Sequence, residues 1–174
     1  IYKRLFEADN IAALRPYATP GSTVVDVGAN IGFFALRFAG WLGSNGRVLA
    51  IEPEERNFAS LCRAIARQRK QSIIEPILAA AAETDGPLHL KLNPYHPGDH
   101  KIADSGIPVT GIRLDTLLSE RGGPPVSLIK IDVQGAEARV LAGGRVAIAR
   151  DRPVLFIEID DDALAAMGSS ASAV

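Results

Sequence analysis

The chain has 174 residues, 47% hydrophobic and 22% charged, which is enough for one ordinary globular domain, and no apolar run approaches the roughly 20 residues that cross a membrane. The formal net charge is −1 and the basic residues are mostly scattered, so we expect neither nucleic acid nor a membrane as a partner. The single cysteine, Cys62, excludes a disulfide within the chain and suits a reducing compartment, so we expect a cytoplasmic protein.

Strand and helix patterns alternate along the chain, which is typical of a mostly parallel sheet with helices on both faces. The first half is expected to contain helix 5–14, strand 23–27, helix 31–42, strand 47–52, helix 53–68 and strand 72–80. A turn at 83–86 then leads to a short strand at 87–92. The stretch 93–107 is the least regular part. Because loops on a rigid scaffold often carry substrate contacts, we expect specificity to reside there.

The second half continues the alternation. It is expected to contain an extended segment at 109–114, a short helix capped by Asp115, strands at 126–131 and 153–159, and a short helix at 163–167. No internal repeat or linker divides the chain, so we expect one α/β domain over 1–174. Its expected parts are a first helix within 1–20, a cofactor-binding half at 21–82, an insert with a substrate loop at 83–115, and a second half at 116–174.

The most informative motif lies where the first strand ends. Asp26 lies near the end of this apolar strand, and a turn that contains Gly28, Ala29, Asn30 and Gly32 leads into an apolar helix. Such a turn presents helix N-terminal amides and bare backbone to a ligand, which predicts a cofactor site. Asn30 stands where a dinucleotide motif has its second glycine, but asparagine tolerates a positive φ, so the turn can form. An acid at this strand end suits a positively charged ligand better than a pyrophosphate and favours a sulfonium cofactor.

A second acid ends the next strand. Glu52 follows the glycine turn by about 20 residues, where a carboxylate holds ribose hydroxyls in nucleoside-binding α/β folds. Pro53 comes next and suits the first position of a helix. Glu52 could instead cap that helix, and the two roles are compatible.

Four separated segments together carry a family resemblance. They are Asp26–Gly32 (DVGANIG), Ile51–Pro53 (IEP), Leu128–Glu137 (LIKIDVQGAE) and Arg152–Glu158. With these segments in this order and spacing, the chain resembles the FkbM family of S-adenosylmethionine-dependent methyltransferases. The resemblance implies a Rossmann-like class I methyltransferase fold. It also implies transfer of a methyl group from S-adenosylmethionine to a hydroxyl of a small-molecule acceptor such as a sugar or polyketide.

The resemblance further implies roles for individual residues. Glu52 would hold the ribose, and Asp132 would face the transferring methyl group. The expected cofactor-binding residues are Asp26, Gly28, Ala29, Asn30, Gly32, Glu52, Pro53 and Ala81. The chain departs from the family pattern at Gln134, where the family usually has glutamate, and at 79–82, where four alanines leave backbone groups or Glu83 to bind the adenine.

Methyl transfer to a hydroxyl needs alignment of the acceptor and removal of its proton. Histidine, with an ordinary pKa of about 6.5, suits this task better than aspartate at about 3.9. His96 and His100 are therefore the candidates for a general base, with Asp132 orienting the acceptor or holding a metal. Both histidines could equally be solvated loop residues. The spacing of His96 and His100 would indicate a metal site only on a helix, and Pro97 argues against a helix there. No metal site is therefore expected.

Sheets of the type that the chain resembles usually close with two further strands, and no remaining segment has the length or apolar content to form them. The strand that leads to Glu158 is therefore expected at an open edge. An open edge predicts self-association, or a natural sequence that continues beyond Val174.

Two other classes of function remain as alternatives. A nicotinamide-dependent oxidoreductase would use the same sheet and the same Glu52, and only the glycine spacing and Asp26 speak against it. A cofactor-binding scaffold without turnover would carry the same motifs.

Overall fold

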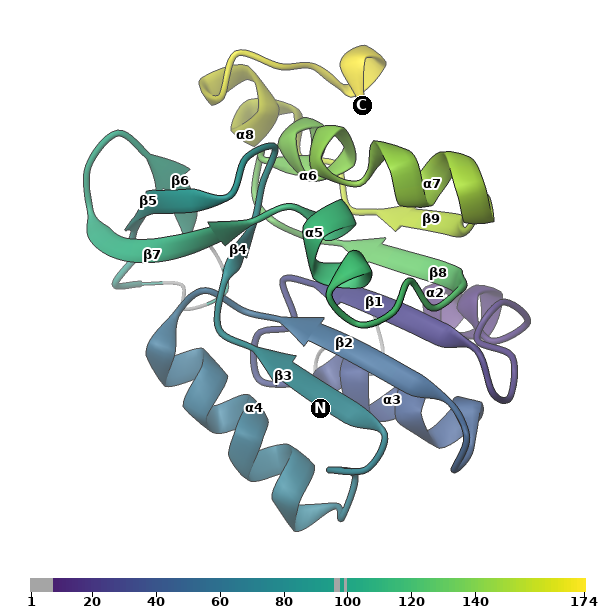
Figure 1. Cartoon of the computed structure of the whole chain (residues 1–174). Helices are drawn as coiled ribbons and strands as arrows, with labels where there is room; N and C mark the ends of the chain where they lie inside the picture. Colours follow the sequence, from purple (N-terminus) through teal and green to yellow (C-terminus); the bar gives the residue numbers. More distant parts are fainter. Residues whose placement is uncertain (1–7, 96–97, 99) are drawn as a thin grey trace.

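The computed structural model describes residues 8–95, 98 and 100–174, and its centre is a five-stranded parallel sheet (Figure 1). The strands, in spatial order, are β3 (Ile74–Ile77), β2 (Arg47–Ile51), β1 (Thr23–Val27), β8 (Val126–Ile131) and β9 (Val154–Ile157). The chain runs outward from β1 to β3 and then crosses to β8 on the other side of β1. The strand order thus reverses between β1 and β8, and open α/β sheets bind ligands at the carboxyl ends of such strands.

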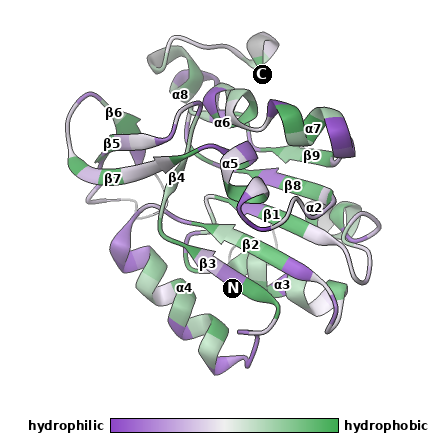
Figure 2. Ribbon diagram, viewed as in Figure 1, coloured by the Kyte–Doolittle hydropathy of each residue, from purple (hydrophilic) through white to green (hydrophobic). Residues whose placement is uncertain are grey.

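Helices cover both faces of this sheet, so the expected Rossmann-like α/β fold is confirmed. The first face carries α2 (Ala8–Leu14), α3 (Phe33–Leu42) and α4 (Glu55–Arg67), and the second carries α5 (Leu114–Ser119), α6 (Glu137–Gly143) and α7 (Arg145–Asp151). Because side chains alternate along a strand, Val24 packs on the first face and Val25 on the second. Hydrophobic residues accordingly dominate the central strands (Figure 2). No helix within the described residues is long and apolar enough to cross a membrane.

A second, four-stranded sheet is built from the segment between β3 and α5. Its spatial order is β4 (Ala80–Ala81), β7 (Ile107–Ile112), β5 (Gly86–Lys91) and β6 (Lys101–Ala103), with β5 antiparallel to both β6 and β7. The irregular segment expected at 93–107 therefore contains a strand. The single strand expected at 72–80 is also wrong, because the chain leaves the central sheet after Ile77 and Ala80 pairs with Gly111 in the second sheet.

The predicted cap of α5 is wrong. The residue that precedes this helix is Arg113, and its side chain makes no capping hydrogen bond. Asp115 instead accepts hydrogen bonds from the backbone amides of Val146 (3.2 Å) and Ala147 (2.9 Å) at the start of α7. A carboxylate is favourable at the positive N-terminus of a helix, so Asp115 ties α5 to α7.

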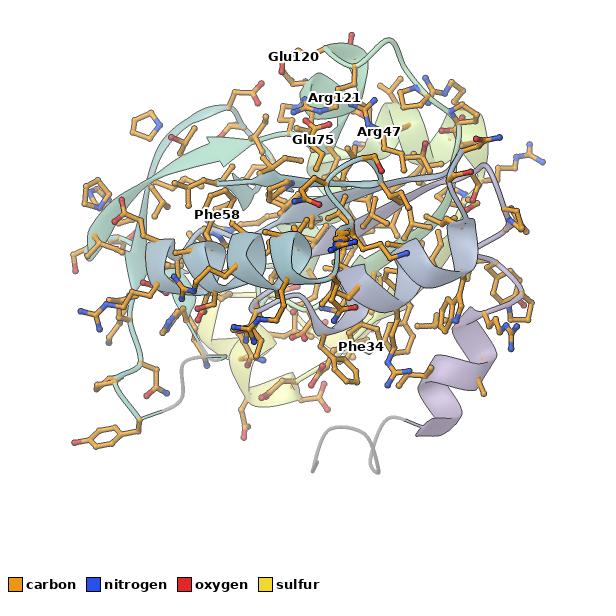
Figure 3. The ribbon with its side chains drawn as sticks, turned by 90° about the horizontal axis from the view of Figure 1, so that it is seen from below. Phe34, Arg47, Phe58, Glu75, Glu120 and Arg121 are labelled. Carbon is orange, nitrogen blue, oxygen red and sulfur yellow. The ribbon has the colours of Figure 1, made fainter. Side chains whose placement is uncertain are left out.

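The two edge strands of the central sheet, β3 and β9, differ in the side chains that they present. At β3, Glu75 accepts hydrogen bonds from Arg47 (2.6 Å) on β2 and from Nε of Arg121 (2.7 Å), which covers this edge with charged groups (Figure 3). At β9, Leu155 is 37% exposed. The position of β9 at an edge is confirmed within the described residues, whereas self-association through it stays a prediction. After β9 the chain forms α8 (Asp161–Ala166) and the short helix η1 (Ala171–Ala173).

Candidate functional site

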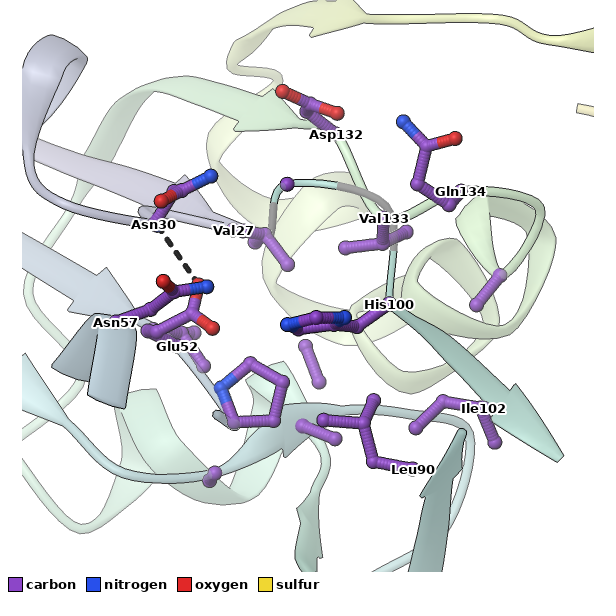
Figure 4. A pocket seen from close by; sticks show the side chains of 18 of the residues that line it. Val27, Asn30, Glu52, Asn57, Leu90, His100, Ile102, Asp132, Val133 and Gln134 are labelled. Atoms are coloured by element: carbon purple, nitrogen blue, oxygen red, sulfur yellow. Dashed lines mark hydrogen bonds between the residues drawn. The ribbon is translucent and has the colours of Figure 1, made fainter. Parts of the chain in front are cut away.

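A cavity lies at the carboxyl ends of β1, β2 and β8, where they face the second sheet (Figure 4). Its wall includes seven residues that the sequence singled out: Gly28, Asn30, Glu52, Pro53, Ala81, His100 and Asp132. Asp26, Ala29 and Gly32 lie outside this wall. His96 falls outside the described residues. The sequence thus located the cavity, while the cofactor-binding and catalytic roles of these residues stay predictions.

The turn after β1 has the backbone conformation that its composition predicts. Gly28 has a φ of +74° and Asn30 a φ of +50°, so Asn30 does adopt the left-handed region. A side chain at Gly28 would collide with the carbonyl oxygen of Asp132. Gly32 begins α3 with a φ of +94°, and a side chain there would meet Leu61. Gly28 therefore allows close approach of β1 and β8, and Gly32 allows close packing of α3 on α4.

Glu52 joins the turns that follow β1 and β2. Its carboxylate accepts hydrogen bonds from the backbone amides of Asn30 (2.8 Å, dashed in Figure 4) and Glu54 (3.0 Å), and the residue is only 5% exposed. The cap of α4 is Glu54, whose side chain accepts from the amide of Asn57 at 2.7 Å. Glu54 therefore caps α4, and Glu52 lies in the cavity wall instead.

Burial also changes the protonation of Glu52. It raises the pKa of the carboxyl group above the ordinary glutamate value, and the hydrogen bonds from Glu54 and Asn30 offset part of that shift. A carboxylate has about four lone-pair positions. After accepting the two amides and a hydrogen bond from the side chain of Asn57, Glu52 therefore retains the capacity to accept one further hydrogen bond from the cavity.

Beneath the cavity, Lys130 binds two carboxylates at once. Its Nζ lies 3.3 Å from Oδ1 of Asp26 and 3.3 Å from Oδ2 of Asp132, and it donates to the carbonyl oxygen of Gly28 at 3.0 Å. Asp26 and Lys130 are direct neighbours on β1 and β8. Asp26, expected to line the cofactor site, therefore lies under its floor, fully buried against the lysine.

Asp26, Lys130 and Asp132 form a charged triad, in which burial and mutual attraction change the pKa values of Lys130 and Asp26. Burial would lower the pKa of Lys130, but attraction to Asp26 and Asp132 outweighs it, so the pKa is raised and the lysine stays charged. Burial raises the pKa of Asp26, and the ammonium of Lys130 offsets only part of that shift. With both carboxyl groups ionised, the triad of Asp26, Lys130 and Asp132 carries one net negative charge next to the cavity.

The turn after β8 places Gln134 in the cavity wall. Gln134 has a φ of +56°, and the following amide of Gly135 donates to Oε1 of the buried Glu137 at 3.1 Å. A side chain at Gly135 would collide with the carbonyl of Ala163, so this turn also packs against α8. These contacts fix the turn that carries the uncharged Gln134.

Sequence reasoning missed part of the wall. Leu90 and Ile102 contribute to it from β5 and β6, and Asn57 and Val133 from α4 and the turn after β8. The alternation of Leu88 and Leu90 marked a strand with one apolar face, but nothing local indicated what that face covers.

Within the described residues, no three histidine, cysteine or acidic side chains gather closely enough to hold a metal ion. His96, one of the two histidines weighed as ligands from the sequence, lies outside those residues. The expectation that no metal is bound stays a prediction.

The comparison with known proteins decides the family. Residues 26–172 match the family model described as the methyltransferase FkbM domain. The chain belongs to the FkbM methyltransferase family. One relative is 31-O-demethyl-FK506 methyltransferase FkbM of Streptomyces tacrolimicus, 31% identical over 158 residues, with 71% of this chain and 60% of the relative covered. Another is 2-O-methyltransferase NoeI of Sinorhizobium fredii, 26% identical, with 83% of this chain and 66% of the relative covered.

A third relative within these comparisons is hexuronic acid methyltransferase AglP of Haloferax volcanii, 27% identical, with 79% of this chain and 56% of the relative covered. The chain thus spans between 56% and 66% of the length of these three relatives. A solved methyltransferase FkbM from Methylobacillus flagellatus KT matches 81% of this chain and 36% of its own, with a TM-score of 0.59 and 24% identity. This match supports the fold.

Proposed function

We propose that the chain provides the cofactor-binding core of an S-adenosylmethionine-dependent O-methyltransferase that acts on a small-molecule hydroxyl. The observation that carries the proposal is the position of Glu52, a buried carboxylate in the cavity wall next to the glycine turn. The names of the three relatives support methylation of a polyketide or sugar-type acceptor. The single Cys62 is consistent with a reducing compartment such as the cytoplasm.

The residues present fit this cofactor. Glu52 retains an acceptor position for a ribose hydroxyl beside the hydrogen bonds from Asn30, Glu54 and Asn57. Gly28 and Asn30 line the cavity at the turn after β1, where the methionine part would lie, and the net negative charge of the triad is complementary to a sulfonium. When bound, S-adenosylmethionine supplies an electrophilic methyl group. The protein then has to hold the acceptor oxygen in line with that group and keep the site shielded from water.

Asp132 is the residue that we assign to orienting the acceptor hydroxyl. Lys130 holds its Oδ2, so the carboxylate has a fixed direction, and its side chain is 18% exposed. Asp132→Asn is expected to lower turnover by about 10²-fold, since small displacements of an aligned acceptor have effects of that size. Affinity for S-adenosylhomocysteine should change little.

The experiment follows labelled methyl transfer from S-adenosylmethionine to a panel of sugars and polyketides, alongside calorimetry with S-adenosylhomocysteine. Asp162→Asn, on the exposed side of α8, is a matched control and should behave as wild type. Full turnover in Asp132→Asn would remove Asp132 from the reaction. Binding of the cofactor without transfer to any acceptor would instead favour a scaffold without turnover.

Affinity for S-adenosylhomocysteine should also depend on pH through Glu52. The ionised carboxylate accepts ribose hydroxyls better than the protonated acid does, so affinity should fall as pH falls through the pKa of Glu52 in the folded protein. Because burial raises that pKa, the loss should begin at a higher pH than for an ordinary glutamate. Calorimetry across the acidic range measures this. In Glu52→Gln the affinity should be lower and this pH dependence absent; an identical profile in wild type and variant would contradict the assignment.

A further inference from the structure

His100 lies in the cavity wall with one of its two ring nitrogens already occupied. Nδ1 accepts a hydrogen bond of 3.0 Å from the backbone amide of Asn93. A backbone N–H is always a donor, so Nδ1 presents a lone pair, and in the neutral imidazole the proton is then on Nε2. While this bond is present, neither nitrogen of neutral His100 is available to take a proton from an acceptor hydroxyl. The geometry argues against the role of general base.

The same hydrogen bond fixes the position of the ring. It lies just beyond the last ladder pair of β5 and β6, Lys91 with Lys101, and so joins the two ends of the connecting loop. In Figure 4 the imidazole lies near the centre of the cavity wall, which also includes Glu52 and Val133. His100 is thus held in a fixed orientation before any ligand binds.

The surroundings of the ring fit the base of a nucleoside. Leu90, which is 2% exposed, and its ladder partner Ile102 form an apolar part of the wall close to the ring (Figure 4). The wall also contains Ala79, Ala80 and Ala81, whose side chains leave room for a flat group but make no hydrogen bonds. The imidazole adds a flat face that packs on a purine and an N–H donor.

We propose that His100 is a cofactor-binding residue: its ring packs against the purine of S-adenosylmethionine and its Nε2–H donates to the nucleoside. The proposal rests on the proposed function and deepens it, because it assigns the polar side chain that the four-alanine segment does not supply. His100 then takes no part in removing the proton of the acceptor.

His100→Asn separates the two roles of the side chain. The shorter asparagine carries an acceptor oxygen near the position of Nδ1, so the bond to Asn93 can be kept, while the ring and the Nε2 donor are lost. Affinity for S-adenosylhomocysteine and for adenosine should fall by a similar factor, about tenfold or more for a hydrogen bond and a packing contact. In the transfer assay KM for S-adenosylmethionine should rise, with kcat at saturation nearly unchanged.

Two further variants make this test specific. His100→Phe keeps the flat ring and should recover part of the affinity that His100→Asn loses. His89→Asn, on the exposed side of β5 and outside the cavity wall, should bind as wild type. Thermal melting of each variant checks that it is folded.

The outcomes are distinguishable. Unchanged affinity in His100→Asn, with or without a loss of kcat, would overturn the proposal, and a loss of about 10²–10⁴-fold in kcat alone would restore the general base. If the wild-type chain binds neither S-adenosylhomocysteine nor adenosine, the proposed function itself fails, and this proposal fails with it.

Discussion

Replacing Lys130 with methionine is expected to lower the free energy of unfolding by about 3–5 kcal/mol, because it removes one partner of a buried ion pair. Asp26 is fully buried, and within the described residues its ion-pair partner is Lys130, whose Nζ lies 3.3 Å from its Oδ1. Lys130 is therefore what makes the charge on Asp26 tolerable. A loss of this size is a large part of the roughly 5–15 kcal/mol that stabilises an ordinary domain. Urea denaturation at neutral pH measures it.

The double variant Lys130→Met with Asp26→Asn is the control. It removes the stranded charge and should recover much of the stability that Lys130→Met loses. The pH dependence has a defined sign. In Lys130→Met the pKa of the buried Asp26 is raised further, so stability should decrease as pH rises from the ordinary aspartate value through the folded pKa. Two results together would show that Asp26 is not the source of the loss. Lys130→Met would be no more stable in acid than at neutral pH, and the double variant would be no more stable than Lys130→Met.

Glu52→Ala is expected to abolish most cofactor affinity. A hydrogen bond from a ribose hydroxyl to a charged acceptor contributes about 1.5–3 kcal/mol, which corresponds to a loss of about 10–10²-fold. The variant also frees the amides of Asn30 and Glu54, which Glu52 holds at the edge of the cavity. Calorimetry with S-adenosylhomocysteine measures the change.

Glu54→Ala separates the ribose contact from general damage to the turn. Glu54 caps α4 and lies outside the cavity wall. Its loss should lower stability by about 1 kcal/mol, the usual effect of removing a helix cap, and leave cofactor affinity almost intact. Equal losses of affinity in Glu52→Ala and Glu54→Ala would contradict a direct role for Glu52.

The central sheet could be predicted in detail because its signals are local. The expected strands 23–27 and 126–131 coincide with β1 and β8, since each is a mostly apolar, mostly buried run that ends at a turn. The second sheet could not be predicted in the same way. Its strands are short, and β6 has only three residues, so its pairing with β5 is decided by contacts across a long loop rather than by local pattern.

The site, like the sheets, could be predicted only where its signals are local. Glu52 and Asn30 were both recognised, and their direct hydrogen bond follows from the adjacency of the turns after β1 and β2. The pairing of Asp26 with Lys130 depends on the register between β1 and β8, which the sequence alone does not specify. A lysine inside an otherwise apolar strand was the available signal, because a buried lysine requires an acidic partner.

The most direct test of S-adenosylmethionine as the cofactor of this chain is a calorimetric titration with S-adenosylhomocysteine and, separately, with NADH. We expect S-adenosylhomocysteine to bind at one site per chain, Glu52→Ala to lose this binding, and NADH not to bind. Tight binding of NADH without binding of S-adenosylhomocysteine would contradict this expectation and favour a nicotinamide-dependent oxidoreductase.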